Sequence, residues 1–111
     1  MKKTKVAIDI HQFPQEIQEV LKHILDLTKP EYVFLYNCKY DLEGELNSFK
    51  LCVICEFEDK RRIYANIFDV DCEVPFDVIL YTKEQFKELK ADEFSFVSRV
   101  CAKGQMLYGK E

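Results

Sequence analysis

The stretch LNSFKLCVICEF, residues 46–57, constrains the fold of this chain more than any other segment. Its apolar, β-branched centre has the length of a strand, which predicts a strand buried inside a sheet. Lys50 stands near the start of this run, where a buried strand ordinarily carries another apolar residue. A charge at that position needs either a partner on the same face of the sheet or a path to solvent.

The segments before this run predict a helix, a strand and a loop. Apolar residues at helical spacing follow Pro14, and the helix is expected to end before Lys29-Pro30, because a residue that precedes proline resists the α conformation. The aromatic and β-branched residues 31–37 predict a buried strand. The polar residues 39–48 predict a loop between this strand and the next.

The segments after the run predict three helices and a further strand. Apolar residues at helical spacing favour a helix over residues 60–70, and FDVILYT, residues 76–82, predicts a strand. Thr82 is expected to cap a helix that opens at Lys83. A last helix over residues 93–103 would bury Phe94 and end at Gly104, and residues 105–109 predict a short edge strand or tail. The sum is one α/β or α+β domain over residues 1–111, with helices packed on a small sheet.

Composition narrows the class of function. A chain of 111 residues with 48% hydrophobic and 32% charged residues is typical of a single globular domain. The net charge of -4 argues against a nucleic-acid partner, because phosphate contacts require clustered lysine and arginine. No apolar run approaches the roughly 20 residues that span a bilayer, and residues 1–5 lead into a mixed segment rather than a signal core, so we expect a cytoplasmic protein without a membrane partner.

The cysteines and histidines do not form a metal-binding pattern. The five cysteines are expected to be reduced thiols. Cys52 and Cys55 have the C-x-x-C spacing, but residues three apart on a strand point to opposite faces and cannot share an ion. His11 and His23 have no second ligand at a suitable spacing.

Several strings resemble the minimal nucleotidyltransferases of the DNA polymerase β superfamily. FDVILYTKEQFKEL, residues 76–89, is similar to the third strand of that family with its aspartate, here Asp77, and to the helix that follows. FVSRVCAKGQMLYG, residues 96–109, is similar to its last helix running into Leu-Tyr-Gly. The resemblance covers roughly residues 12–109 and implies a nucleotidyltransferase-like mixed sheet.

The chain departs from the family where the chemistry takes place. The Gly-Ser pair that begins the nucleotide-binding turn is replaced by Asn37-Cys38. The two positions of the Asp-x-Asp motif hold Ser48 and Lys50, so Asp77 alone remains of three carboxylates. Two divalent ions require several carboxylates that converge on one point, which a single aspartate does not provide. Cys38 is interpreted as buried filler, with a reactive thiol as the alternative.

Two hypotheses account for Lys50. If residues 49–57 pair with residues 76–82, as in the family, Lys50 and Asp77 project from one face and the ammonium compensates the carboxylate. Alternatively, Lys50 extends to solvent from the end of its strand.

For function we expect a catalytically degenerate domain without metal or cofactor, which acts as an interaction module. The resemblance implies an antitoxin-like partner of a small helical protein, since such nucleotidyltransferases often occur in toxin-antitoxin pairs. The aromatic content of 14% also favours a helical partner or a homo-oligomer, or simply a core rich in phenylalanine. The alternative is an active magnesium-dependent nucleotidyltransferase that combines Asp77 with acids of the loop (Asp41, Glu43 and Glu45) and transfers a nucleotide to a hydroxyl.

Overall fold

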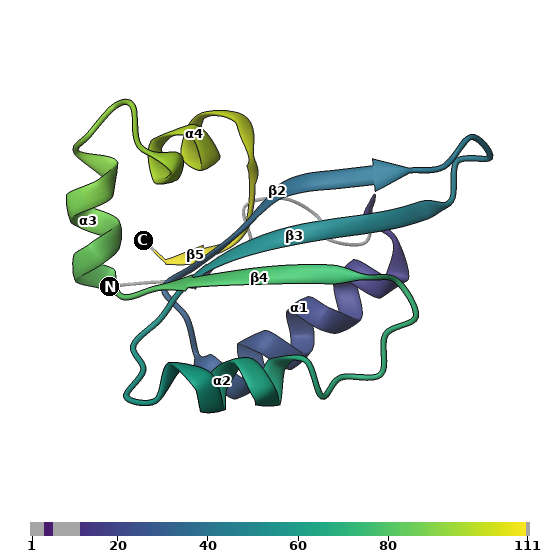
Figure 1. Ribbon diagram of the computed structural model, residues 1–111, viewed down its shortest axis with the longest axis horizontal. Helices are drawn as coiled ribbons and strands as arrows, with labels where there is room; N and C mark the ends of the chain where they lie inside the picture. Colours follow the sequence, from purple (N-terminus) through teal and green to yellow (C-terminus); the bar gives the residue numbers. More distant parts are fainter. Residues whose placement is uncertain (1–3, 6–11, 111) are drawn as a thin grey trace.

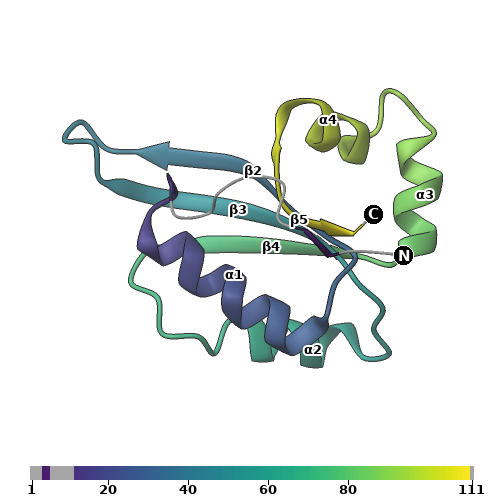
Figure 2. The same ribbon diagram turned by 180° about the vertical axis from the view of Figure 1, so that it is seen from behind.

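The computed structural model describes residues 4–5 and 12–110, which form a mixed sheet with helices on both faces (Figures 1 and 2). The predicted α+β class is confirmed. In chain order the elements are β1 (Thr4–Lys5), α1 (Gln15–Thr28), β2 (Tyr32–Tyr40), β3 (Leu46–Ile54), α2 (Lys60–Ile67), β4 (Phe76–Tyr81), α3 (Lys83–Lys90), α4 (Phe96–Lys103) and β5 (Gln105–Lys110). The N-terminal segment considered above, apart from β1, and His11 lie outside the described residues.

The sheet has the strand order β1-β5-β2-β3-β4. β2 is antiparallel to both β3 and β5, whereas β3 and β4 are parallel and are connected through α2. The predicted strand at residues 105–109 is confirmed as β5, but its predicted place at the edge of the sheet is wrong, because Thr4 and Lys5 pair with the outer side of β5. The edge at the other side of the sheet is β4.

Half of the predicted loop over residues 39–48 is strand. β2 runs to Tyr40 and β3 begins at Leu46, so only a tight turn separates them. Asp41 Oδ1 closes this turn by accepting hydrogen bonds from the N–H groups of Glu43 and Glu45, both at 2.9 Å, and Gly44 supplies the positive φ of 87°. The strand ends resemble a loop in sequence because they extend beyond the helices and carry polar residues (Figure 1).

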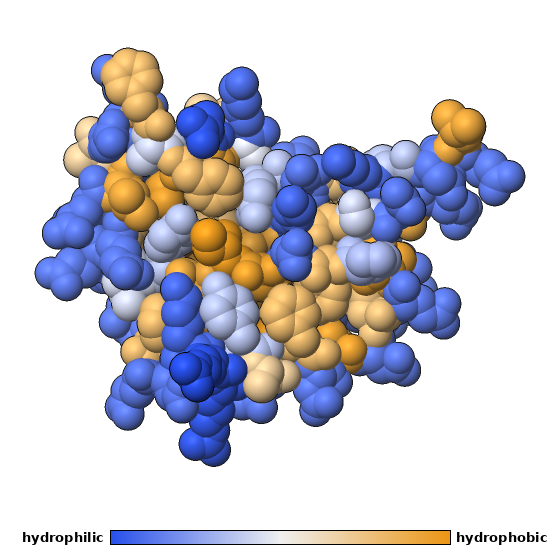
Figure 3. All heavy atoms as spheres, viewed as in Figure 1, coloured by the Kyte–Doolittle hydropathy of each residue, from blue (hydrophilic) through white to orange (hydrophobic). Residues whose placement is uncertain are grey.

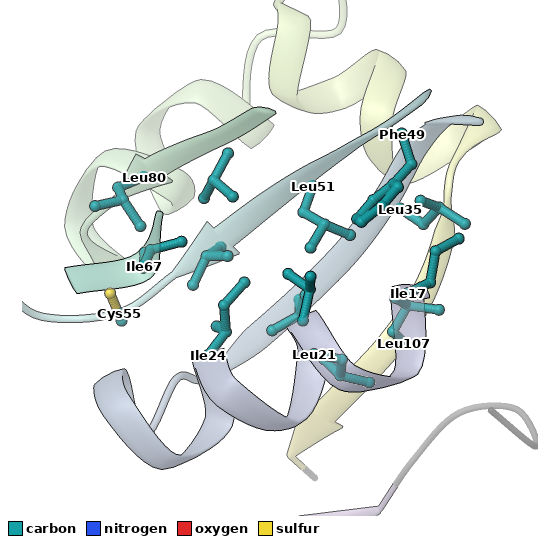
Figure 4. Close-up of a cluster of buried hydrophobic side chains, with 14 residues drawn as sticks. Ile17, Leu21, Ile24, Leu35, Phe49, Leu51, Cys55, Ile67, Leu80 and Leu107 are labelled. Atoms are coloured by element: carbon teal, nitrogen blue, oxygen red, sulfur yellow. The ribbon is translucent and has the colours of Figure 1, made fainter. Parts of the chain in front are cut away.

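One face of the sheet, here called the α1/α2 face, carries the main core. Ile17, Leu21 and Ile24 of α1 are buried against apolar residues of the strands (Figure 4). Leu51 at the centre of β3 is 0% exposed. The predicted helices over residues 14–28 and 60–70 are confirmed as α1 and α2, and Ile67 of α2 joins this core.

The opposite face, here called the α3/α4 face, carries a second cluster. Its buried members are Phe34, Cys52, Ile54, Phe86, Val97 and Val100. The Thr82 cap is confirmed, with Thr82 and Gln85 forming a capping box. The last helix begins later than predicted because Ser95 accepts the N–H of Ser98, and Phe94 lies before it and is 80% exposed rather than buried.

Gly104 ends α4 at a close approach to β2. A Cβ at this position would lie 2.7 Å from the carbonyl oxygen of Val100 and 2.9 Å from that of Leu35, so only glycine fits. In the part of the chain that is described, no helix is long and apolar enough to cross a membrane.

Candidate functional site

Alternate residues of β3 serve the two faces of the sheet. Phe49, Leu51 and Val53 are buried in the core of the α1/α2 face, whereas Cys52 and Ile54 belong to the cluster of the α3/α4 face. By this alternation Lys50 projects from the α3/α4 face. Cys52 and Cys55 belong to different clusters, so their thiols lie on opposite sides of the sheet, as the spacing predicts.

Lys50 is the register partner of Asp77 across the parallel pair of β3 and β4. Register partners in neighbouring strands point to the same face, which confirms the predicted juxtaposition. On its other side Lys50 is paired with Asn37 of β2. Asn37, Lys50 and Asp77 therefore form one row across three strands, here called the polar row.

Asp77 is the second residue of β4, and Figure 1 shows that the start of this strand lies away from α3 and α4. The polar row therefore lies toward the end of the α3/α4 face that these helices leave open. Asn37 and Lys50 are half-buried, and Asp77 is exposed. Ser48, the other position of the missing motif, is also half-buried and pairs with Lys39 further along the hairpin. The sequence resemblance thus identified residues of three different strands that the fold brings together.

Lys50 and Asp77 share a face but are not joined by a hydrogen bond. Among residues 12–110 no hydrogen bond joins the two side chains, and no buried side-chain nitrogen or oxygen lacks a partner. The ammonium of the half-buried Lys50 therefore reaches solvent, as the second hypothesis proposes. Because Asp77 is exposed, water screens the attraction between the two charges, and the pair contributes at most about 1 kcal/mol to stability.

Asn37 and Cys38 lie within a paired strand and not in a turn. They are opposite Lys50 and Phe49 of β3, directly after an irregularity in register at Tyr36. The side chain of Asn37 therefore lies on the α3/α4 face with the rest of the polar row, whereas Cys38 packs against the core of the α1/α2 face. A phosphate-binding turn needs consecutive N–H groups that converge on one point, which an extended ladder does not provide.

Tyr36 separates the polar row from the helices. Its ring meets Phe96 of α4 edge to face, with the ring centroids 5.1 Å apart. Burial raises the pKa of the Tyr36 phenol, and the nearby Cys52 and Asp77 raise it further. This position of Tyr36 could not be predicted from the sequence, because it depends on a register shift that no motif encodes.

The side chains of the polar row do not fit the two magnesium ions that the family resemblance implies. Within the row, Asp77 offers one carboxylate and the Lys50 ammonium repels a cation. Ser48, which lies outside the row, offers only a neutral hydroxyl. Within the described ranges, no group of three or more histidine, cysteine, aspartate or glutamate residues is placed to hold a metal.

Several acids outside the polar row accept hydrogen bonds that hold the fold together. The carboxylate of Asp41 closes the hairpin turn. Glu56 accepts the N–H of Lys83 at 3.1 Å, and Asp59 accepts the N–H of Arg62 at the start of α2. Glu56 and Asp59 follow the carboxyl end of β3, at the far end of the strand from Ser48. His23 is also engaged, because its Nε2 donates to the carbonyl oxygen of Asn66 at 2.8 Å.

In comparisons with known proteins, no family model, no curated protein and no solved structure matches this chain.

Proposed function

We propose that this chain is a nucleotidyltransferase-like domain that has lost its metal-binding carboxylates and acts by binding another protein. The observation that carries the proposal is the register pairing of Lys50 with Asp77. In the family that the sequence resembles, the position of Lys50 is that of a second aspartate. A cation there opposes the binding of divalent ions on which nucleotide transfer depends.

The extended backbone at Asn37 and Cys38 supports the same proposal. Both residues are held in the ladder between β2 and β3, so their N–H groups do not form a cradle for a triphosphate. The side chain of Asn37 also occupies the face on which the nucleotide would lie.

Exposed apolar side chains support a role in binding. Leu42 at the hairpin tip and Phe94 between α3 and α4 are 106% and 80% exposed, and Tyr40 and Phe68 are 51% and 43% exposed. Figure 3 shows apolar side chains over the middle of the molecular surface that is turned to the viewer, and others that project at the hairpin tip. Surfaces of this kind are characteristic of protein interfaces. The partner that we propose is a small helical protein, as in toxin-antitoxin pairs, with a second copy of the chain as the other form of assembly.

A transfer assay tests the loss of catalysis. The protein is incubated with magnesium and labelled ATP, with Asp77→Ala as the matched variant. The proposal expects no magnesium-dependent transfer of label by either protein. Transfer by the wild-type chain that Asp77→Ala abolishes would instead establish the active enzyme.

Co-expression tests the binding role. The chain is produced together with the product of the adjacent gene, and the mass of the purified material is measured by light scattering. A complex of fixed stoichiometry is the expected result. A monomer that forms no complex and transfers nucleotide would contradict the proposal.

A further inference from the structure

A cavity of about 400 Å³ opens beside α3, apart from the polar row. It is lined by Tyr32, Lys83, Phe86, Lys87, Lys90 and Ala91. All but Tyr32 belong to α3 or directly follow it. The cavity combines an aromatic floor with a basic rim, and neither feature was singled out by the sequence.

The floor of the cavity is rigid and apolar. Phe86 is 7% exposed, and its ring centroid lies 5.4 Å from that of Tyr32 and 6.0 Å from that of Phe34. Three rings from β2 and α3 thus support one another. A preformed apolar surface of this kind binds an apolar side chain with little reorganisation.

The rim of the cavity is a stripe of exposed lysines. Lys83, Lys87 and Lys90 occur at positions i, i+4 and i+7 of α3, so they lie along one side of the helix. Lys90 Nζ is 5.6 Å from the centroid of the Phe86 ring, which places a positive charge directly over the floor. The chain as a whole has a net charge of -4, whereas this stripe is positively charged and therefore favours an acidic ligand.

The spacing of the lysines indicates the shape of that ligand. The stripe extends over roughly 10 Å along the axis of α3, about two helical turns. A second helix packed beside α3 presents acidic residues with the same period and apolar residues between them, as flanking charges do in helical pairs. An isolated anion would satisfy the lysines but leave the aromatic floor uncovered.

We propose that the groove along α3 binds an acidic amphipathic helix of a partner protein. An apolar side chain of that helix occupies the cavity over Tyr32 and Phe86, and its glutamate or aspartate residues face Lys83, Lys87 and Lys90. This inference rests on the proposed binding function and adds the surface and the chemistry of the partner.

The test uses a synthetic peptide as the probe. The peptide is an 18-residue amphipathic helix with leucines on one face and flanking glutamates, and a second peptide carries lysines in place of those glutamates. Binding to the full ¹⁵N-labelled chain is followed by the shifts of backbone amide resonances. We expect the acidic peptide to shift the resonances of α3 and Tyr32 and the basic peptide to leave them unchanged.

Charge reversal provides the matched comparison. Lys87→Glu combined with Lys90→Glu changes two exposed side chains, and Lys22→Glu on the exposed side of α1 is the control. The double variant should bind the acidic peptide about tenfold more weakly or worse and gain affinity for the basic peptide, whereas Lys22→Glu should bind like wild type. Equal binding by all three proteins would overturn the inference.

Other occupants appear as separate outcomes of the same titration. ATP or a single-stranded oligonucleotide can be titrated in place of the peptide. If either shifts the α3 resonances to completion at a lower concentration than the acidic peptide does, the ligand of the groove is a phosphate compound and not an acidic helix. Peptide shifts confined to the hairpin tip, or no shifts at millimolar peptide, would also overturn the inference. These results do not affect the proposed loss of catalysis, because the peptide titration reports on α3, whereas the transfer assay with Asp77→Ala reports on the polar row.

Discussion

The two faces of the sheet are built differently, although they share the same strands. The α1/α2 face is a continuous apolar core that draws on every helix turn of α1 and on β2, β3, β4 and β5. The α3/α4 face has a smaller cluster under its helices and a polar row at the end that the helices leave open. On β3 the difference appears between neighbouring residues, since Leu51 is completely buried and Lys50 reaches solvent.

This difference indicates a division of tasks. Burial of apolar side chains on the α1/α2 face provides most of the stability, because the hydrophobic contribution grows with the area removed from water. The α3/α4 face tolerates a lysine and an aspartate because both have access to solvent. Changes at Leu51 and at its neighbour Lys50 should therefore differ sharply in their effect on stability, and the first and last of the following predictions test this difference.

The largest expected effect is that of Leu51→Ala. Leu51 is 0% exposed in the core of the α1/α2 face, so truncation leaves a cavity that the rigid sheet cannot close. We expect the free energy of unfolding to fall by about 3 kcal/mol, as measured by urea denaturation. A loss below about 1 kcal/mol would mean that this face is not the principal core.

A pH-dependent effect is expected at Cys52, the next residue along the strand. Burial, followed by the neighbouring Cys101, raises the pKa of the Cys52 thiol from 9.0 to about 12. Since the folded state holds the proton that the unfolded state releases, stability is full below pH 9 and falls as pH rises toward 12. The decrease should be about 1.4 kcal/mol for each pH unit within that window.

Cys52→Ala is the control for this pH dependence. Urea denaturation at several pH values above 9 should show a shallower decline for the variant than for wild type. If the free energy of unfolding falls with pH equally steeply in both proteins, the Cys52 thiol is not kept protonated by burial under the α3/α4 face.

A smaller effect is expected at the open edge of the sheet. The hydroxyl of Tyr64 in α2 accepts a hydrogen bond from the N–H of Leu80 in β4, at 3.0 Å. Tyr64→Phe removes this acceptor and should lower the free energy of unfolding by about 1 kcal/mol. Hydrogen exchange of the Leu80 amide should accelerate in the variant, and unchanged protection would show that the bond is not formed in solution.

The smallest effect is expected for Lys50→Ala. Because the ammonium reaches solvent and forms no hydrogen bond with the exposed Asp77, the free energy of unfolding should change by no more than about 0.5 kcal/mol. A loss of 2 kcal/mol or more would show that Lys50 is the counter-ion of Asp77, as the first hypothesis proposes.

The elements that follow strong local patterns could be predicted from the sequence. The apolar spacing in α1, the Thr82 cap and the stop at Gly104 could each be read from a local sequence pattern, and all three are confirmed. The ends of β2 and β3 that form the hairpin have the polar sequence of a loop, because strand residues beyond the helices have few apolar neighbours to pack against. The place of β5 inside the sheet depends on pairing with a distant two-residue strand, which no local pattern encodes.

The candidate site was predictable in part. The placement of Lys50 beside Asp77 was expected only if residues 49–57 pair with residues 76–82 as in the family that the sequence resembles, and the structure has this pairing. Alternation along a strand fixes the face of a residue but not its partner in the next strand. The irregularity at Tyr36 and the aromatic floor beside α3 arise from contacts between elements far apart in sequence. Such contacts become visible only in the folded chain.

Magnesium titration by calorimetry tests the central claim most directly, namely that the polar row lacks the charge to hold divalent ions. Wild type is compared with the double variant Ser48→Asp and Lys50→Asp, which restores the missing carboxylates beside Asp77. The account predicts that millimolar magnesium gives no binding heat with wild type and saturable heat with the double variant, which a further Asp77→Ala change removes. Saturable binding to wild type that Asp77→Ala abolishes would contradict it.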